Sequence, residues 1–329
     1  MVWILGGIGL VVLLAGAALQ FAIWRNGPAV LSTVDAMVGG SRDAERMATI
    51  ATGDHPQQKV IVWGPKHRDP AAAPAPVLVF AHGGSWRNGD PVDYGFIGRT
   101  FVPKGFIVVL VGYRLSEDGR YPAMLEDTAR AVAWTHEEIA DYGGDPDHIV
   151  LAGHSAGAYN VVMTALEEQW LARLGQSTQV IKGVVGMSGP YDFVPLDSDS
   201  TIASFGHLDD PMVSQPAEHI GENAPPMLLV HGTKDTLVRP RNSRHLAKEL
   251  RAQDNRVEAL GLEDMDHNQP LIALAAPWRG NEVKLFDASF TSPRDPINLV
   301  DEIAAFAMNV AERTEIEGQT SVPVKAKTR

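Results

Sequence analysis

The sequence contains no cysteine. Disulfide bonds, thiolate zinc sites, iron–sulfur clusters and a cysteine nucleophile are therefore excluded, as is a lipid anchor attached through cysteine. Basic residues are also scarce, because 28 Lys and Arg stand against 40 Asp and Glu and give a formal net charge of −12. Binding to phosphate groups requires a basic surface, so we expect no nucleic-acid partner.

The length and composition suit a folded protein with a substantial core. The chain has 329 residues, of which 45% are hydrophobic and 21% are charged. These values fit one large domain or two small ones.

The segment of residues 2–24 stands apart because it contains no charged residue. As a helix it would span about 34 Å, enough to cross a bilayer. A buried core helix or a cleaved signal peptide would also be apolar, and Ala15-Gly16-Ala17 resembles a cleavage site. However, the segment lacks a basic leading stretch, and its apolar run is long for a signal peptide. We therefore predict a membrane anchor over residues 1–25, followed by a linker over residues 26–50.

Between residues 51 and 313, apolar runs alternate with stretches that have helical spacing of apolar residues. The strand candidates are Val77–Ala81, Phe106–Val111, Ile149–Ala152, Ile181–Met187, Met227–Val230 and Val257–Leu262, and the helix candidates are Tyr121–Tyr142, Ala156–Leu174, Asn242–Gln253 and Val300–Arg313. This alternation predicts a mostly parallel sheet with helices on both faces. In such sheets, active groups follow the carboxyl ends of strands. The polar residues 314–329 are predicted to form a disordered tail.

The sequence GHSAG at residues 153–157 directly follows one of these strands. It fits the G-x-S-x-G nucleophile elbow, a sharp turn between a strand and a helix that presents a serine hydroxyl. A simple Gly-Ser turn is the alternative. The position of the motif between a strand candidate and a helix candidate favours Ser155 as a nucleophile.

A serine hydroxyl is a weak nucleophile near neutral pH, so it needs a base, and the base needs an acid that orients it. In this architecture they occur in the order serine, acid, histidine. Asp235 follows the strand candidate that ends at Val230, and His267 follows the last strand candidate. These two residues are our predicted acid and base. The competing residues are a histidine in a helix candidate, three acids close to His267 in sequence and two acids before the strand, namely His245, Glu263, Asp264, Asp266, Asp209 and Asp210.

The run His82-Gly83-Gly84 follows the strand Val77–Ala81. Attack on a carbonyl places negative charge on its oxygen, and two backbone N–H groups must point at that oxygen. Glycines allow such an approach without a side chain in the way, so we predict that Gly83, Gly84 and Ala156 form the oxyanion hole. Residues next to these motifs are candidates for the substrate pocket, namely His82, Ser85, Trp86, Tyr113 and His154.

These motifs resemble the α/β-hydrolase superfamily, and in particular a branch of bacterial esterases and kynurenine-formamidase-like enzymes related to hormone-sensitive lipase. The segments VFAHGGSW, GHSAG and LLVHGTKDTLV carry the resemblance, which covers about residues 51–312. It implies a catalytic domain over residues 51–313, with a mostly parallel sheet of eight strands and a short cap. The sequence departs from the pattern at Ser85, where a third glycine is usual, and at Gly112, where asparagine is common.

The resemblance and the motifs together predict a serine hydrolase that cleaves small carboxylic esters without a metal or an organic cofactor. Two alternatives stay open: an amidase of the arylformamidase type acting on N-formylkynurenine, and a catalytically silent binding protein on the same fold. A substrate that bears a carboxylate would require a cation in the pocket, and Arg87 and Arg114 are the cations nearest to the motifs in sequence.

For location, Arg25 favours a cytoplasmic domain, whereas the missing cysteines and the anchors common among exported relatives favour export. We predict an anchor in the bacterial inner membrane through residues 2–24, with the periplasmic side favoured. The sequence does not indicate the oligomeric state.

Overall fold

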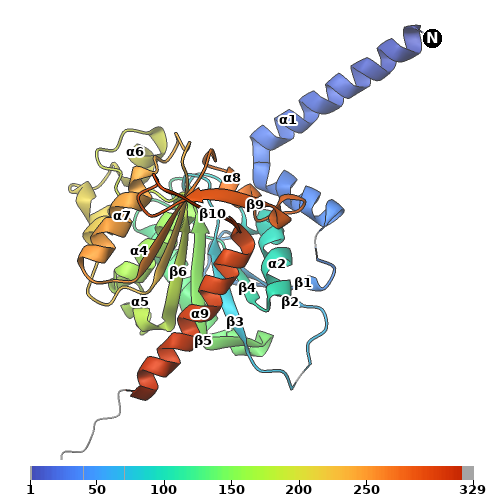
Figure 1. Cartoon of the computed structure of the whole chain (residues 1–329). Coiled ribbons are helices and arrows are strands. Elements are labelled where there is room, and N and C mark those ends of the chain that lie inside the picture. The colour runs from blue at the N-terminus through green and yellow to red at the C-terminus, as the bar shows by residue number, and fades with distance from the viewer. Residues whose placement is uncertain (1, 40, 70, 321–329) are drawn as a thin grey trace, which may run out of the picture.

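The computed structural model describes residues 2–39, 41–69 and 71–320. Over these residues the chain forms one ten-stranded sheet in the order β1-β2-β4-β3-β5-β6-β7-β8-β9-β10. The sheet lies at the centre of the domain (Figure 1). The strands are β1 Ala44–Ala51, β2 Lys59–Pro65, β3 Ala75–Ala81, β4 Ile107–Val111, β5 Gly144–His154, β6 Ile181–Met187, β7 Met227–Gly232, β8 Val257–Leu262, β9 Glu282–Phe286 and β10 Pro293–Asn298. The central pairs from β4 to β8 are parallel, and the pairs toward both edges are antiparallel.

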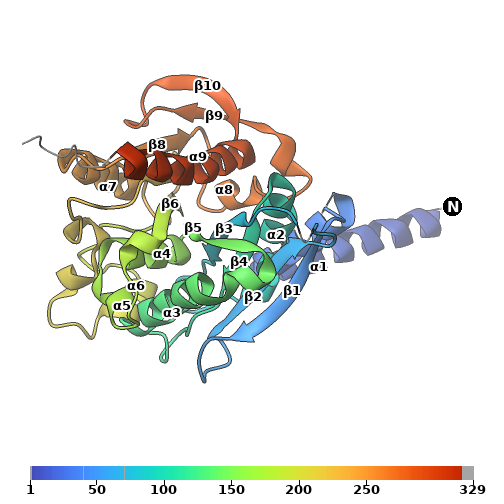
Figure 2. The same cartoon turned by 90° about the horizontal axis from the view of Figure 1, so that it is seen from below.

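Helices cover both faces of the sheet (Figure 2). They are α1 Val2–Val38, α2 Gly95–Phe101, α3 Ala123–Glu138, α4 Ala156–Leu166, α5 Gln169–Ala172, α6 Asp199–Phe205, α7 Arg241–Ala252, α8 Gln269–Ile272 and α9 Leu299–Thr320. Side chains of α3, α4, α5 and α7 belong to one buried cluster, and side chains of α2, α8 and α9 belong to a second. The sheet therefore separates two apolar layers.

Strand β3 shows why the central sheet forms. Its residues Val77 and Val79 lie in the first cluster, and Leu78 and Phe80 lie in the second. Successive side chains point to opposite faces of a strand, so a strand covered by helices on both faces must be apolar throughout. This requirement explains why the central strands could be identified as continuous apolar runs.

The sheet has two more strands than the eight predicted. Strands β9 and β10 were not identified because their sequences, EVKLF and PRDPIN, contain charged residues or proline. In β9 only Val283 and Leu285 are buried, and in β10 the first four residues are exposed. Such edge strands bury few side chains, so their apolar pattern is weak. The mostly parallel centre of the sheet is as predicted.

Helix α1 is kinked at Asn26, whose φ of −156° and ψ of 79° are not helical. The first part of α1 extends away from the domain, and the second part lies against it (Figure 1). There the fully buried Asp35 accepts hydrogen bonds from Arg99 Nε at 2.6 Å and from the backbone N–H of Ala276 at 2.7 Å. Residues 26–50, predicted as a linker, therefore contain a docked helical segment and most of β1.

In the ranges given above, none of the helices combines the length and the apolar character needed to cross a membrane. The prediction of a transmembrane anchor over residues 1–25 is therefore wrong. The predicted inner-membrane location, which depended on residues 2–24, is wrong for the same reason. The prediction considered the apolar run by itself. In the structure this run belongs to α1, which continues past Arg25 to Val38 and is fixed to the domain through Asp35. Met1 lies outside the described residues.

The two ends of the folded region differ from the predicted boundaries. Helix α9 continues to Thr320, into the stretch predicted to be a disordered tail, and residues 321–329 lie outside the described residues. Between β6 and β7 the chain forms a small cap that contains α6 and two single helical turns, Pro211–Ser214 and Pro216–Glu218. The cap reaches the carboxyl ends of the central strands, where the predicted site residues lie.

Candidate active site

Ser155 occupies the turn between β5 and α4. Its φ of 55° and ψ of −121° are strained for a residue with a side chain. The two flanking glycines are required by close packing. A Cβ atom on Gly153 would overlap the backbone of Gly157, and a Cβ atom on Gly157 would overlap the backbone carbonyl of Ala81 in β3. The turn thus holds the Ser155 hydroxyl at the edge of the sheet.

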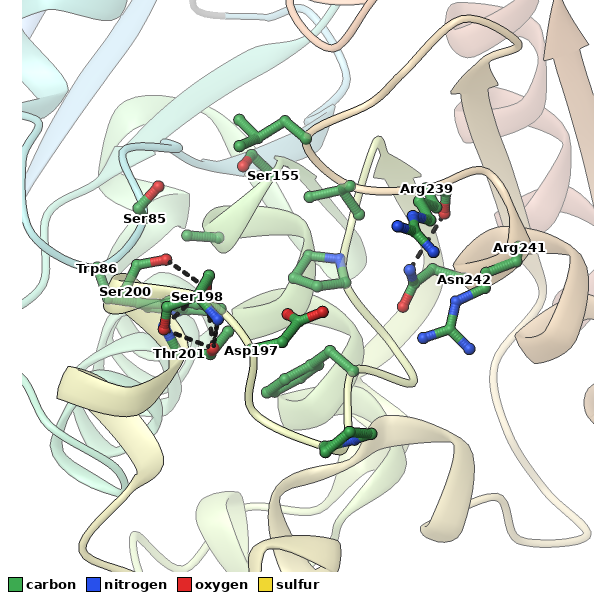
Figure 3. Close-up of a pocket in the computed structure, with 16 residues that line it drawn as sticks. Ser85, Trp86, Ser155, Asp197, Ser198, Ser200, Thr201, Arg239, Arg241 and Asn242 are labelled. Carbon is green, nitrogen blue, oxygen red and sulfur yellow. Dashed lines mark hydrogen bonds between the residues drawn. The ribbon is translucent and has the colours of Figure 1, made fainter.

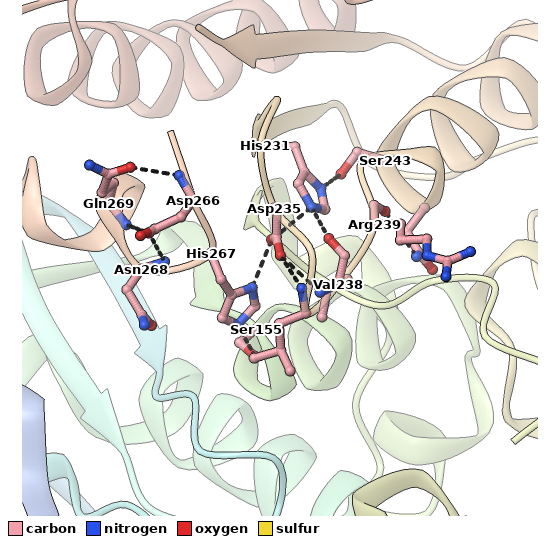
Figure 4. Close-up of polar contacts among 12 residues, drawn as sticks. Ser155, His231, Asp235, Val238, Arg239, Ser243, Asp266, His267, Asn268 and Gln269 are labelled. Carbon is pink, nitrogen blue, oxygen red and sulfur yellow. Dashed lines mark hydrogen bonds and ion pairs between the residues drawn. The ribbon is translucent and has the colours of Figure 1, made fainter. Parts of the chain in front are cut away.

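His267 lies after β8 and contacts Ser155 (Figure 4). Its Nε2 is 2.8 Å from Ser155 Oγ, and its Nδ1 is 2.7 Å from Oδ2 of Asp235, which follows β7. All three residues are largely buried, with relative exposures of 4–7%. An imidazole in this position can accept the hydroxyl proton while the carboxylate orients the ring.

Asp235 is held by four hydrogen bonds. Oδ1 accepts from the backbone N–H groups of Leu237 and Val238, both at 2.9 Å. Oδ2 accepts from His267 and, at 3.1 Å, from Nε2 of His231. Burial would raise the pKa of Asp235, but the hydrogen bonds from the two histidines and the loop lower it well below its usual range. The carboxyl group is therefore ionised at neutral pH.

His154 lies behind the catalytic candidates rather than in the cavity. Its Nε2 donates to the backbone carbonyl of His267 at 2.8 Å, and its ring centroid is 5.0 Å from that of His267. Burial, with a smaller contribution from nearby His267, lowers the pKa of His154 to about 3. The side chain is therefore neutral and supports the His267 loop.

The loop after β3 passes directly over the serine. A Cβ atom on Gly83 would lie 3.2 Å from the Cβ of Ser155, and Gly84 has a φ of +126° that favours glycine. A side chain on Gly84 would also overlap the backbone carbonyl of Asn88. Gly84 thus requires glycine for its backbone conformation, and Gly83 allows a close approach to Ser155 that a side chain would crowd. Ala156, the third predicted donor, follows Ser155 at the first position of α4 and lines the cavity.

Two of the predicted pocket residues are buried beneath this loop. His82 is 1% exposed and stacks on Tyr113 with ring centroids 4.5 Å apart. Tyr113 donates its hydroxyl to the backbone carbonyl of His82 at 2.7 Å. Burial lowers the pKa of His82 to about 4, so this ring is also neutral. His82 and Tyr113 hold the loop in place and do not line the cavity.

Trp86 and Ser85 do line the cavity next to Ser155 (Figure 3). Trp86 donates its indole N–H to Oδ1 of the buried Asn160 at 3.0 Å. Its ring also meets Phe205 of the cap edge-on, with centroids 4.9 Å apart. Trp86 therefore fixes the glycine loop to α4 and to the cap.

The cavity at Ser155 has a volume of about 150 Å³. Sequence reasoning missed three charged residues of its lining, namely Asp197 of the cap together with Arg239 and Arg241 at the start of α7 (Figure 3). Arg241 lies 3.8 Å from the Asp192 carboxylate. The proximity of Arg239 to Asp235 in sequence was the available signal. Of the arginines considered from sequence, Arg114 is instead bound to Asp127 at 2.8 Å.

Five of the six competing residues have other partners. His245 faces Asp192 and Glu249, Glu263 faces Lys284, Asp264 pairs with Lys234, and Asp266 and Asp210 accept backbone N–H groups of their own turns. Among the residues with described side chains, no group of three or more His, Asp or Glu is arranged to hold a metal ion.

Comparison with known proteins finds one matching family model and several esterases that are similar to this chain in sequence. A family model named BD-FAE matches residues 65–250, a range that includes Ser155 and Asp235 and ends before His267. The esterase LipC of Mycobacterium tuberculosis is 28% identical over 218 residues, which are 61% of this chain and 54% of LipC. The esterase LipQ of the same organism is 32% identical over 204 residues, which are 56% of this chain and 48% of LipQ. The chain thus spans about half the length of these curated relatives.

Among solved structures, esterase B from Lactobacillus rhamnosis is similar with a TM-score of 0.70 and 19% identity. The match covers 93% of this chain and 98% of that one. A truncated carbohydrate esterase from gut microbiota matches with a TM-score of 0.66 and 15% identity, over 83% of this chain and 99% of that one. These similarities confirm the α/β-hydrolase fold that the sequence motifs predicted.

Proposed function

Because the chain belongs to the BD-FAE family and has the α/β-hydrolase fold, we propose that it is a serine hydrolase that cleaves small carboxylic esters. The observation that carries this proposal is the continuous contact from Ser155 Oγ through the His267 ring to Asp235, at 2.8 Å and 2.7 Å. The esterases among its relatives support the same activity.

In the proposed reaction, Ser155 Oγ attacks the ester carbonyl carbon while His267 Nε2 takes the hydroxyl proton. The C–O bond to the alcohol breaks, and the imidazolium returns the proton to the leaving oxygen. Water then attacks the acyl-enzyme with the same proton transfers and releases the acid. The ionised Asp235 stabilises the imidazolium and keeps the Nδ1–H of His267 pointing away from the serine.

The negative charge that develops on the carbonyl oxygen needs donors in place before the reaction. We assign this role to the backbone N–H groups of Gly83, Gly84 and Ala156. The support is the close approach of Gly83 to Ser155 and the position of Ala156 at the start of α4. Loss of one such donor typically costs about 10²–10³ in rate.

The size of the cavity restricts the substrate. A volume of about 150 Å³ between the glycine loop and the cap suits a short acyl group. Additional methylenes that remain in water gain nothing, whereas each buried one contributes about 0.8 kcal/mol. We expect kcat/KM for p-nitrophenyl esters to be highest from acetate to hexanoate and to fall for longer chains.

One observation favours the formamide alternative, namely the two arginines of the cavity. Arg239 and Arg241 provide positive charge near Ser155 that the carboxylate of an amino-acid substrate requires. Asp197 lines the same cavity and opposes this charge. An amidase of the arylformamidase type is therefore our second candidate function.

The test compares kcat/KM for p-nitrophenyl butyrate and N-formylkynurenine on the purified protein and on Ser155→Ala. We expect the ester to be the better substrate and Ser155→Ala to lose activity on both. A fluorophosphonate should label Ser155, and mass spectrometry will locate the adduct. A preference for the formamide above about tenfold, which corresponds to about 1.4 kcal/mol in transition-state binding, would replace the ester proposal. Absence of both labelling and turnover in the folded protein would contradict the hydrolase proposal and favour the catalytically silent alternative.

A further inference from the structure

The Asp235 carboxylate contacts a second imidazole besides that of His267. His231, the fifth residue of β7, is fully buried. Its Nε2 lies 3.1 Å from Asp235 Oδ2, the same oxygen that His267 contacts, and 2.7 Å from the backbone carbonyl oxygen of Val238 (Figure 4). Two histidines therefore meet on one oxygen of the carboxylate.

The contacts determine which nitrogen of His231 carries the proton. Both neighbours of Nε2 are acceptors only, an ionised carboxylate and a carbonyl, so Nε2 must be protonated and shares its proton between them. Nδ1 lies 2.8 Å from the Ser243 hydroxyl in α7. A hydroxyl can donate, so a neutral ring with the proton on Nε2 satisfies every contact. The two acceptors at Nε2 therefore fix this tautomer, and the Ser243 hydroxyl is compatible with it.

The proton on His231 Nε2 links Asp235 to Val238, three residues further along the same loop. Val238 donates its backbone N–H to Asp235 Oδ1 and accepts from His231 through its carbonyl oxygen. The carboxylate is therefore fixed between two backbone N–H groups and two imidazoles. Rotation of the carboxylate away from His267 would break several of these bonds at once, and buried unpaired polar groups are costly.

We propose that His231 is a positioning residue for the proposed hydrolysis, which fixes the Asp235 carboxylate toward His267 and draws part of its negative charge away from that ring. This role rests on the proposed function. His231 does not line the cavity and touches no reacting atom. It acts on Ser155 only through Asp235 and His267.

The direction of the effect follows from charge. Without the donor at Nε2, Oδ2 presents more negative charge to His267 and stabilises its protonated form more strongly. The acid limb of kcat/KM should therefore move to higher pH, because the base must lose its proton to act. The other charged or titratable groups around His267 and Asp235 are His154 at the end of β5, His82 under the glycine loop, Asp266 in the His267 loop, the paired Lys234 and Asp264, and Asp197, Arg239 and Arg241 beside the cavity. None of them contacts Asp235 Oδ2 in the described part of the chain.

Variants of His231 test the role of the donor. Gln places an amide N–H near the position of Nε2, whereas Asn places it near Nδ1, and Leu has no donor. We expect His231→Asn and His231→Leu to move the acid limb up by about 0.5 pH unit and to lower kcat about tenfold, with KM nearly unchanged. His231→Gln should restore most of kcat and the wild-type limb. Ser243→Ala is the matched control, because it removes a neighbour of the same buried ring and leaves the donor to Asp235 in place. Its pH profile should stay at the wild-type position.

Each result has a defined meaning. Fluorophosphonate labelling of Ser155, carried to completion, counts the active sites in every variant, and kcat is corrected for it. Circular dichroism and the thermal unfolding temperature check independently that each variant is folded. Equal losses in His231→Gln and His231→Asn, or an unshifted acid limb in both His231→Asn and His231→Leu, would overturn the positioning role. If the wild-type protein shows no turnover that depends on Ser155, the proposed function has failed instead. The two failures are therefore distinguishable.

Discussion

The substitution Asp235→Asn tests the proposed catalytic group most directly, because the structure predicts which way the new amide will turn. Oδ1 of Asp235 accepts two backbone N–H groups at 2.9 Å. Asn has one acceptor oxygen, and we expect it to remain on this side, since turning it would leave two N–H groups facing an NH₂ group. The NH₂ group then faces His267 and His231.

In this orientation the NH₂ group, a donor, replaces Oδ2, the acceptor to which both histidines donate in the wild-type protein. His267 can satisfy it only by moving its proton from Nδ1 to Nε2, the nitrogen that lies 2.8 Å from Ser155 Oγ. A protonated Nε2 cannot accept the hydroxyl proton. An Asp-to-Asn change that produces the wrong tautomer in a Ser-His-Asp triad lowers kcat by about 10⁴, and we expect a loss of this order.

The measurement is kcat for p-nitrophenyl butyrate at pH 7.5, with KM and the thermal unfolding temperature determined on the same preparation. Asp266→Asn is the matched control. Asp266 directly precedes His267, is exposed, and accepts two backbone N–H groups of its own turn, a role that Asn also fills. The control should retain activity within about twofold. A loss below about tenfold in Asp235→Asn would refute the proposed role of Asp235.

Three further predictions concern the glycine loop, pH and the docked helix. Gly84→Ala should lower kcat about 10²-fold, because its Cβ would displace the loop from the Asn88 backbone. Gly175 also has a positive φ but has open space around it, so the control Gly175→Ala should leave kcat unchanged. Equal kcat values in the two variants would contradict the role of the loop. Burial lowers the pKa values of His82 and His154 to about 4 and 3, so the unfolded chain binds more protons than the folded chain below pH 6.5. The free energy of unfolding, measured in urea, should therefore decrease from pH 6.5 toward 4 by roughly 1.4 kcal/mol per pH unit for each histidine. A free energy of unfolding that is constant over this range would contradict these shifts. Asp35→Ala leaves Arg99 without its buried partner and should lower the free energy of unfolding by about 3 kcal/mol while kcat stays unchanged, and a change in kcat would show that α1 affects the site.

Much of the candidate site could be predicted from sequence because each part imposes a local requirement. Ser155 needs glycines on both sides to fit against β3 and α4, and Gly84 needs a positive φ. Because these positions need glycine, they appear as recognisable motifs even in a single sequence. Asp235 and His267 have no motif of comparable strength. They were identified from their order in the chain and from their places after strand candidates, and the structure brings both of them to Ser155.

The features that could not be predicted depend on contacts between distant segments. Arg239 and Arg241 line the cavity only because the start of α7 turns toward the cap. The docking of α1 depends on the buried Asp35, which forms ion pairs with Arg99, 64 positions away, and with Arg279, and accepts the backbone N–H of Ala276. The apolar run of residues 2–24 was therefore interpreted without the part of the helix that follows it, and the predicted anchor was wrong.

The three histidines around the site show how the fold assigns different roles to one side chain. All three lie near the carboxyl ends of parallel strands: His154 ends β5, His231 is the fifth residue of β7, and His267 follows β8. His154 donates to a backbone carbonyl and His231 donates to Asp235, so the contacts of each are satisfied by a neutral ring with a fixed proton. His231 and His267 each have the Asp235 carboxylate on one nitrogen and a hydroxyl on the other, but the hydroxyl at His231 is that of the fully buried Ser243, whereas the hydroxyl at His267 is that of Ser155, which lines the cavity. A proton gained at Nε2 of His267 is stabilised by Asp235, whereas a second proton on His154 would be buried beside another imidazole without a carboxylate. The arrangement of neighbours, rather than the presence of histidine, therefore supports His267 as the proposed base.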